Sequence, residues 1–288
     1  LSKQQPEKEW PSASTVGEIL KREGLVRERN RRSKTPPYTE PFKECNGSNQ
    51  VWSADYKGRF KTRDQRYCYP LTITDNHSRY LLECRGLQSQ SFVETQPWFE
   101  WAFRKYGLPD AIRTDNGVPF ASVGVGGLSR LSVWFIKLGI IPERIDPGCP
   151  AQNGRHERMH RTLKADATKP PGDDLLEQQE IFERFKHEYN YERPHEALGQ
   201  QSPSSVYTPS PRAYPEKIPK IEYGEDMEVR YIHKQGWFRW RGKQVFLTKA
   251  LAYEKVALEQ TDDHVWEICF SSYKLAKLNE KTGKIERH

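Results

Sequence analysis

The chain has 288 residues and a mass of 33.7 kDa, and its 46 lysines and arginines exceed its 39 acidic residues, a net charge of +7 that favours a polyanionic partner. No apolar run approaches the roughly 18 residues needed to span a bilayer, and the first residues are polar and charged, so we expect a soluble protein with no membrane contact. The five cysteines are odd in number and widely spaced without a C-x-x-C pair, which excludes a disulfide framework and predicts a reducing compartment.

The first predicted element is a short capped helix that begins after Ser12 and ends near Gly24. It is similar to the recognition helix of a helix-turn-helix without its first helices. Residues 21–34 hold seven basic and two acidic side chains, a block that can contact DNA phosphates but equally suits a solvated linker. We assign residues 1–34 to this partial helix-turn-helix and basic segment, and the proline-containing residues 35–50 to a linker. The candidate DNA contacts here are Arg29, Arg31 and Arg32.

From Val51 onward, apolar and polar residues alternate with the period of a β-strand packed on one side. One face of this strand would carry Trp52, Ala54, Tyr56 and Phe60, and the other Ser53, Asp55, Lys57 and Arg59. Asp55 is therefore expected to point away from the main core. Two further strands, Tyr67–Thr74 and Tyr80–Cys84, would complete a three-stranded meander.

Helices and strands are then expected to alternate as far as residue 207. An apolar helical stripe from Phe92 to Tyr106 contains Pro97, which should kink the helix or mark its true start. A short buried strand, Ala111–Thr114, leads into the turn Asp115-Asn116-Gly117. The later elements are a flexible glycine loop at Gly124–Gly127, a helix through Leu138, a strand at Ile140–Ile141, a helix capped by Asn153 that carries Glu157, and a helix capped by Asp174 that ends at Arg193.

Residues 208–224 are proline-rich and predict a second linker, beyond which six short runs separated by turns predict a small β-barrel over residues 225–288. Between Arg230 and Lys249 lie six basic and no acidic residues, interleaved with aromatic ones. Such a pattern can hold phosphates and stack on bases. Aromatic residues that simply fill the barrel explain the pattern equally well. The candidate DNA contacts are Arg239, Arg241 and Lys243.

Three acids are candidates for a shared site. In a mixed sheet flanked by helices, Asp55 in the first strand and Asp115 at the tip of the fourth can be neighbours, and Glu157 can join them from its helix. Carboxylates suit Mg²⁺ or Mn²⁺, and two such ions about 3.5–4 Å apart can activate a water or a 3′-hydroxyl and stabilise the leaving oxygen. For Asp115 alone, an ordinary turn residue is an equal explanation. Positive charge beside the scissile phosphate would come from Arg158, Arg161 and Lys164.

Residues 51 to about 207 resemble the insertion-sequence transposases with a retroviral-integrase-type, ribonuclease-H-like core and a D-D-E triad. The resemblance rests on W-S-A-D-Y-K-G, T-D-N-G, N-G-R-H-E-R-M-H-R-T-L-K, and Y-N-Y-E-R-P-H-E-A-L-G with S-P-S-S-V-Y, in this order. It implies that Asp55, Asp115 and Glu157 are catalytic metal ligands, and that Arg161 and Lys164 contact the DNA end. The spacing from Asp115 to Glu157 exceeds the retroviral type by about one short loop. The glycine-rich insert Val123–Leu128 is expected to absorb this difference, and its role stays open.

The resemblance further implies an α/β fold with a ribonuclease-H-like mixed sheet, a helix-turn-helix region upstream and a small SH3-like C-terminal barrel that binds DNA. The implied protein binds the ends of its element, hydrolyses a phosphodiester and joins the freed 3′-hydroxyl to target DNA, using two Mg²⁺ or Mn²⁺ ions. Expected partners are element-end DNA, target DNA and further copies of the chain assembled on DNA, with helper proteins left open. The expected location is the bacterial cytoplasm, in association with the nucleoid.

Two other interpretations compete. The sequence H-E-R-M-H matches the zinc-peptidase signature, in which His156 and His160 bind Zn²⁺ and Glu157 is the general base, with Glu180 or Glu183 as a third ligand. The dense positive charge on that helix opposes Zn²⁺. The second alternative is a DNA-binding protein with an inactive core, against which the three intact acids argue. The remaining histidines of interest, His77, His187 and His195, are expected in a turn, on the surface and at a helix end.

Overall fold

The computed structural model describes residues 11–25, 42–146 and 154–287. The chain divides into two compact units, residues 1–34 and 35–288. The described part of the first unit contains helix α1 (Ala13–Arg22), and the Ser12 hydroxyl caps it by accepting a hydrogen bond from the backbone N–H of Thr15 at 3.2 Å. The predicted capped helix is thus confirmed. The candidates Arg29, Arg31 and Arg32, much of the first linker, and the expected cap Asn153 lie outside the described residues.

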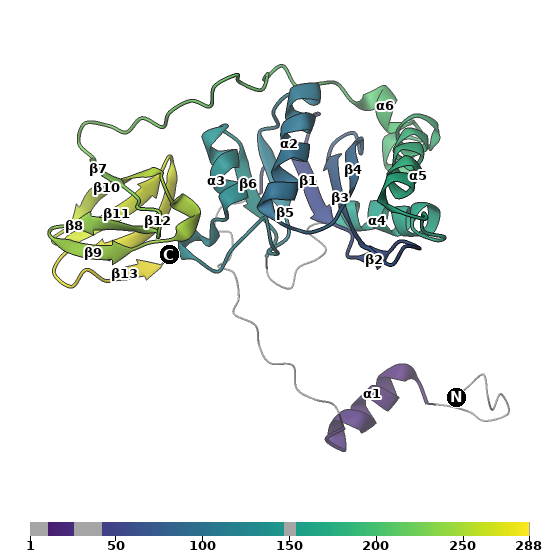
Figure 1. Cartoon of the computed structure of the whole chain (residues 1–288), viewed down its shortest axis with the longest axis horizontal. Helices are drawn as coiled ribbons and strands as arrows, with labels where there is room; N and C mark the ends of the chain where they lie inside the picture. Colours follow the sequence, from purple (N-terminus) through teal and green to yellow (C-terminus); the bar gives the residue numbers. More distant parts are fainter. Residues whose placement is uncertain (1–10, 26–41, 147–153, 288) are drawn as a thin grey trace. The chain divides into compact units, whose positions relative to one another are not determined.

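A six-stranded mixed sheet flanked by helices forms the centre of the second unit (Figure 1). Its strands are β1 (Val51–Tyr56), β2 (Phe60–Lys61), β3 (Tyr67–Asp75), β4 (Leu81–Leu87), β5 (Ala111–Thr114) and β6 (Ile141–Arg144). Strands β1, β3 and β4 form the expected antiparallel meander, whereas β5 and β6 extend the sheet in parallel with β1. Parallel neighbours need a crossover, and α2 and α3 supply it. The predicted α/β class is confirmed.

Helices cover both faces of this sheet. Helices α2 (Phe92–Tyr106) and α3 (Arg130–Lys137) share a buried cluster with Trp52, Ala54 and Tyr56 of β1. Helices α4 (Gly154–Ala167) and α5 (Leu175–His187) share a separate cluster with the opposite side of β3 and β4. The remaining helical segments are η1 (Val125–Gly127), the π-helical turn η3 (Glu188–Glu192), η4 (Glu196–Leu198), α6 (Pro203–Val206) and η5 (Lys249–Leu251). No helix within the described ranges is both long and apolar enough to cross a membrane.

Two local expectations need correction. Phe60 does not continue the β1 face: the strand ends at Tyr56, Gly58 adopts a positive φ of 87°, and Phe60 begins the separate strand β2. The period-two pattern restarts there, so Phe60 packs against the α4–α5 cluster instead. Pro97 lies inside α2 and not at its start, because Ser91 caps the helix by accepting a hydrogen bond from the Glu94 N–H.

The C-terminal residues form a small β domain, as expected. Its strands are β7 (Glu228–Tyr231), β8 (Trp237–Trp240), β9 (Lys243–Phe246), β10 (Lys255–Asp262), β11 (Val265–Phe270), β12 (Tyr273–Asn279) and β13 (Ile285–Arg287). Five of them pair antiparallel in the order β13-β12-β11-β10-β7, and β8 and β9 form a separate hairpin. As far as residues 225–287 are described, the hydrogen bonding therefore gives an open sheet and a hairpin around one apolar core.

The glycine-rich insert, expected as a flexible loop, packs against this C-terminal domain. Val125 and Leu128 belong to the same buried cluster as Leu275 of β12. A Cβ atom on Gly126, whose φ is +64°, would lie 3.0 Å from a Leu275 side-chain carbon. The insert thus combines a left-handed backbone with a close approach, and both conditions favour glycine.

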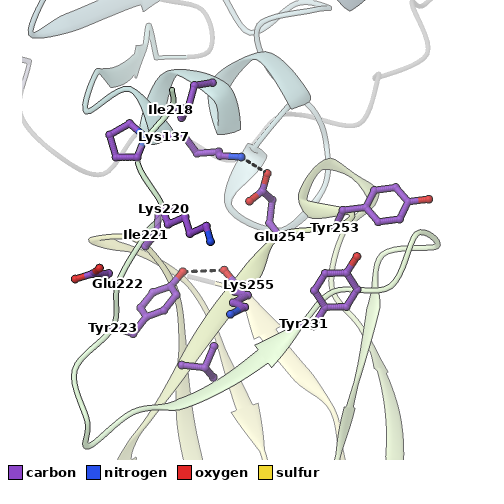
Figure 2. A pocket seen from close by; sticks show the side chains of 12 residues that line it. Lys137, Ile218, Lys220, Ile221, Glu222, Tyr223, Tyr231, Tyr253, Glu254 and Lys255 are labelled. Atoms are coloured by element: carbon purple, nitrogen blue, oxygen red, sulfur yellow. Dashed lines mark hydrogen bonds and ion pairs between the residues drawn. The ribbon is translucent and has the colours of Figure 1, made fainter. Parts of the chain in front are cut away.

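The linker between the two domains is also held in place. Arg212 pairs with Asp110 at 3.1 Å, and Tyr214 packs against the α2–α3 cluster. Lys137 of α3 pairs with Glu254 at 2.6 Å. The linker residues Ile218–Tyr223, together with Lys137 and strand residues of the C-terminal domain, line a cavity of about 730 Å³ (Figure 2). The second linker therefore lies on the protein instead of acting as a free spacer.

We expect Gly126→Ala to lower the free energy of unfolding by about 1–2 kcal/mol, because a Cβ atom is unfavourable at this φ and meets Leu275. Urea unfolding followed by tryptophan fluorescence measures the change. Gly224→Ala is the matched control, since a Cβ atom there has no neighbour within 4 Å. Equal stability of the two variants would contradict the role assigned to the insert.

Candidate active site

Two neighbouring parallel strands bring Asp55 and Asp115 to one edge of the sheet. In the parallel pairing of β1 with β5, Ala54 lies opposite Thr114, and the next residue along each chain is an aspartate. The Asp55 carboxylate accepts a hydrogen bond from the backbone N–H of Tyr56 at 2.7 Å. Both aspartates are partly buried. Residues distant in sequence thus present two carboxylates side by side.

The turn after β5 holds Asp115 in place. The Asp115 carboxylate accepts a hydrogen bond from the Gly117 N–H at 3.0 Å. The Asn116 side chain donates to the carbonyl of Ile145, just beyond β6, at 2.6 Å. A Cβ atom on Gly117 would lie 2.9 Å from one oxygen of Asp115, so glycine leaves room for the carboxylate. Each residue of this turn therefore has a structural role: Asp115 presents the carboxylate, Asn116 ties the turn to the end of β6, and Gly117 leaves space for the carboxylate.

Helix α4 carries the third acid. Met159 and Leu163 face the buried α4–α5 cluster, as expected, and Glu157 is exposed. The charge of Glu157 acts on Asp55 and raises its pKa. The structure therefore brings Glu157 into the electrostatic neighbourhood of Asp55.

The electrostatics of these acids favour a cation. Burial, then the charge of Asp115, raises the pKa of Asp55 to about 7, and the charge of Glu157 adds to this rise. The Tyr56 N–H and the charge of Lys57 act in the opposite direction. Burial also raises the pKa of Asp115. Carboxylates that repel one another in a partly buried site are stabilised by a divalent cation, so this oxygen donor set fits Mg²⁺ or Mn²⁺.

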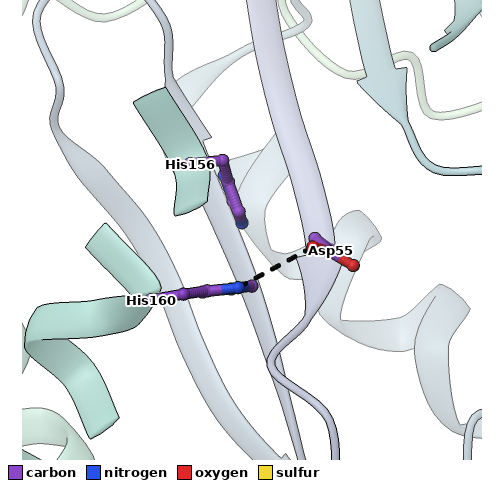
Figure 3. A group of neighbouring side chains, drawn as sticks. All are labelled: Asp55, His156 and His160. Atoms are coloured by element: carbon purple, nitrogen blue, oxygen red, sulfur yellow. Dashed lines mark ion pairs between the residues drawn. The ribbon is translucent and has the colours of Figure 1, made fainter. Parts of the chain in front are cut away.

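The structure also places two histidines of α4 beside Asp55, and sequence reasoning missed their packing. His156 and His160 are buried and extend from α4 toward the sheet (Figure 3). The ring of His156 is hydrogen-bonded to the hydroxyls of Thr72 at 2.8 Å and Thr74 at 2.9 Å. His160 is bonded to Thr72 at 2.7 Å, and its Nδ1 lies 3.7 Å from Asp55 Oδ2. The available signal was the alternation Thr72-Ile73-Thr74, which puts two hydroxyls on one face of β3.

This packing weighs against the zinc-peptidase interpretation. Burial lowers the pKa of His156 to about 3 and that of His160 to about 2, so both rings are neutral, which is the form that binds a metal ion; what opposes a pair of histidine ligands is the engagement of His156. Each ring nitrogen of His156 already has a threonine partner, which leaves none free for Zn²⁺. Glu183, one proposed third ligand, pairs with Lys186 at 2.9 Å on the exposed side of α5.

Comparisons with known proteins agree with this arrangement. Two models described as integrase core domain match residues 46–150 and 138–203, and the model of the IS481 family transposase C-terminal domain matches residues 227–286. The chain thus matches an integrase-type core over residues 46–203 and the C-terminal domain of an insertion-sequence transposase over residues 227–286. The zinc-peptidase alternative has no support from these matches.

The chain is similar to two uncharacterized insertion-element proteins. It is 25% identical over 181 residues to the 31.7 kDa protein of IS407 from Burkholderia multivorans, covering 62% of each chain. It is 26% identical over 189 residues to the 39.2 kDa protein of IS476 from Xanthomonas euvesicatoria, covering 64% of this chain and 52% of that protein. The matched stretches thus span less than two thirds of these relatives.

A retroviral structure shares the fold. The simian T-cell lymphotropic virus intasome, solved in complex with the PP2A regulatory subunit B56 gamma, contains a chain that matches 96% of this protein. The match covers 91% of that chain. The TM-score is 0.50 and the sequence identity 17%. This likeness concerns the fold.

The candidate DNA contacts of the chain differ in their surroundings. Arg158, Arg161 and Lys164 are exposed on α4, and Arg158 lines a cavity of about 590 Å³ together with Arg79 and His195. Arg239, Arg241 and Lys243 are exposed on the β8–β9 hairpin.

Within the hairpin, Arg241 pairs with Glu228 at 2.7 Å and with Glu280 at 3.1 Å, so two acids already offset its charge. Of the interleaved aromatic residues, Phe238 and Trp240 are buried in the core, whereas Tyr231 and Phe246 are exposed. The buried aromatic residues therefore fill the core of the domain, whereas the exposed ones remain available to stack on bases.

Titration of Asp55 should be visible in the stability of the metal-free protein. Its pKa lies near 7 in the folded chain and near 3.8 when unperturbed, so between these values the folded state holds a proton that the unfolded state has lost. Stability therefore falls as the pH rises through this window and levels off above about pH 7. We expect Asp55→Asn to match the wild type near pH 4 and to be more stable than it at pH 8.

Urea unfolding in EDTA at several pH values measures this difference. The exposed turn variant Asp263→Asn is the control and should show no such growth with pH. A constant difference between Asp55→Asn and the wild type from pH 4 to 8 would contradict the burial and charge assigned to Asp55.

The two hairpin arginines should contribute unequally to DNA binding. We expect Arg239→Ala to weaken binding to all DNA sequences and to reduce the slope of log affinity against log salt by about 1, as for one lost phosphate contact. Arg241→Ala should change the slope less, because Glu228 and Glu280 already neutralise Arg241. Fluorescence anisotropy across a salt series tests both variants. A larger change of slope in Arg241→Ala than in Arg239→Ala would contradict a DNA contact by Arg239.

Proposed function

We propose that this chain is a divalent-metal-dependent polynucleotidyl transferase. It binds the ends of its element, hydrolyses a phosphodiester to free a 3′-hydroxyl, and joins that hydroxyl to target DNA. The observation that carries the proposal is the side-by-side placement of Asp55 and Asp115 at the ends of parallel strands. The effect of the Glu157 charge on Asp55 supports a three-carboxylate site.

The residues have separate roles in this proposal. Asp55, Asp115 and Glu157 hold the metal through carboxylate oxygens, and Asp55 loses its proton when the metal binds. Bound Mg²⁺ or Mn²⁺ supplies a Lewis acid that activates the attacking hydroxyl and offsets the charge on the leaving oxygen. Because no protein nucleophile is needed, the positive residues of α4, with Arg161 and Lys164 foremost, serve to orient the DNA phosphates.

The assembly follows from the reaction. Two element ends must be held together during transposition, so we propose that several copies of the chain assemble on DNA, in bacterial cytoplasm and on the nucleoid. The small C-terminal domain contributes DNA contacts through Arg239 and its neighbours, and the residues before the core contribute others. An inactive DNA-binding core is disfavoured, because a protein that only binds DNA has no need to keep repelling carboxylates together in a partly buried site.

Cleavage of DNA that spans an element boundary tests the proposal. We expect Asp55→Asn and Asp115→Asn each to reduce Mg²⁺-dependent cleavage and strand transfer by about a thousandfold, or ~4 kcal/mol of transition-state stabilisation, because each removes a metal ligand. Binding of the same DNA should persist. The control is Asp263→Asn, in an exposed turn of the C-terminal domain. Mg²⁺-dependent cleavage retained by either variant would reject that residue as a ligand.

A further inference from the structure

The hydroxyl of Thr72 determines which ring nitrogens of the α4 histidines carry protons. It donates to the main-chain carbonyl of Asp55 at 3.1 Å and contacts the Nε2 atoms of His156 and His160 at 2.8 and 2.7 Å. A hydroxyl has one proton to donate, and a carbonyl oxygen can only accept. We assign the proton of Thr72 to the Asp55 carbonyl, which can only accept, and with this assignment both histidines donate their Nε2–H to Thr72.

The remaining nitrogens of the two rings differ in their partners. In neutral rings each Nδ1 then carries a lone pair. That of His156 accepts a hydrogen bond from the Thr74 hydroxyl at 2.9 Å, so this ring is fully engaged. That of His160 faces Asp55 Oδ2 at 3.7 Å (Figure 3). A separation of 3.7 Å is too long for a shared hydrogen bond, so the two acceptor atoms face one another with room for a cation between them.

We propose that His160 Nδ1 and Asp55 Oδ2 bind one divalent metal ion together, so that His160 adds a nitrogen ligand to the carboxylate site. The inference rests on the proposed function in that Asp55 is a metal ligand there too. Ligand atoms that each lie about 2.1 Å from one ion can be up to roughly 4.2 Å apart, which accommodates the observed 3.7 Å. The ligand atoms of Asp55, His156 and His160 all lie within 4.8 Å of one another.

The network behind His160 has the form expected of a metal ligand. A ligating histidine donates its other ring N–H to a fixed acceptor, which sets its tautomer and orientation. Here His160 donates to Thr72, and Thr72 is tied to the backbone of Asp55 itself. His156 supports the same hydroxyl and has a positioning role. Because imidazole suits transition-metal ions better than Mg²⁺, His160 should raise the affinity of the site for Mn²⁺ relative to Mg²⁺.

Electron spin echo envelope modulation of Mn²⁺ bound to the full chain tests this inference without relying on activity. We expect ¹⁴N modulation from a directly bound nitrogen, and its replacement by a ¹⁵N pattern when the protein is labelled with ¹⁵N-histidine. The modulation should be lost in His160→Gln and in Asp55→Asn. It should persist in His187→Gln, a control at an exposed histidine of α5 that lies outside this network. The preference for Mn²⁺ over Mg²⁺, measured by competition titration, should fall in His160→Gln.

Because His160 is buried, circular dichroism and thermal melting first establish that its variant folds, and the labelled wild-type chain tests the ligand without any substitution. Bound Mn²⁺ with oxygen ligands alone would overturn the role of His160. If Asp55→Asn still abolished cleavage in that case, the proposed function would stand. Modulation retained in His160→Gln would likewise remove His160 as the ligand. Metal-independent cleavage together with no Mn²⁺ binding would overturn both proposals.

Discussion

The docking of α4 onto the sheet is the interaction on which the candidate site depends. Met159 and Leu163 bury the apolar side of this helix, and the histidines of the same helix meet the hydroxyls of β3. A buried imidazole is costly unless its nitrogens have polar partners, and three of the four ring nitrogens here are hydrogen-bonded to threonine hydroxyls, so the fit between helix and strand is specific in position. This specificity matters because α4 also carries Glu157, whose distance from Asp55 is set by where the helix lies.

The two aspartates depend on a second constraint, the parallel pairing of β1 with β5. The register puts Ala54 opposite Thr114, and a shift by one residue would turn one carboxylate to the other face of the sheet. The core formed by Trp52 and its neighbours under α2 and α3 holds this register, because the alternate residues of β1 are fully buried there. The alternation of apolar and polar residues along β1 therefore does two things: it buries one face in the core and it directs Asp55 to the opposite face.

The contact between the core and the C-terminal domain gives the glycine-rich insert a structural role. Insertions between Asp115 and Glu157 could have formed a free loop. Instead Val125 joins the apolar core of the C-terminal domain, and Gly126 allows Leu275 to approach closely. Together with the Lys137–Glu254 pair and the linker held by Arg212, this contact ties the domain next to the helix that follows β5. These contacts therefore hold the hairpin, with its candidate DNA-binding residues, in a defined position relative to the core.

The sequence by itself determined the elements whose signals are local. The strand Ala111–Thr114, the capped helices and the strands of the C-terminal domain follow from periodicity, turn residues and capping side chains, and the face of Asp55 follows from alternation in one strand. Only the tertiary structure decided the rest. The partners of His156 and His160 are Thr72 and Thr74, far along the chain, and the partner of the insert is Leu275. Alternation within β3 puts Thr72 and Thr74 on one face, but the residues that meet this face cannot be read from periodicity, because they depend on how separate elements pack.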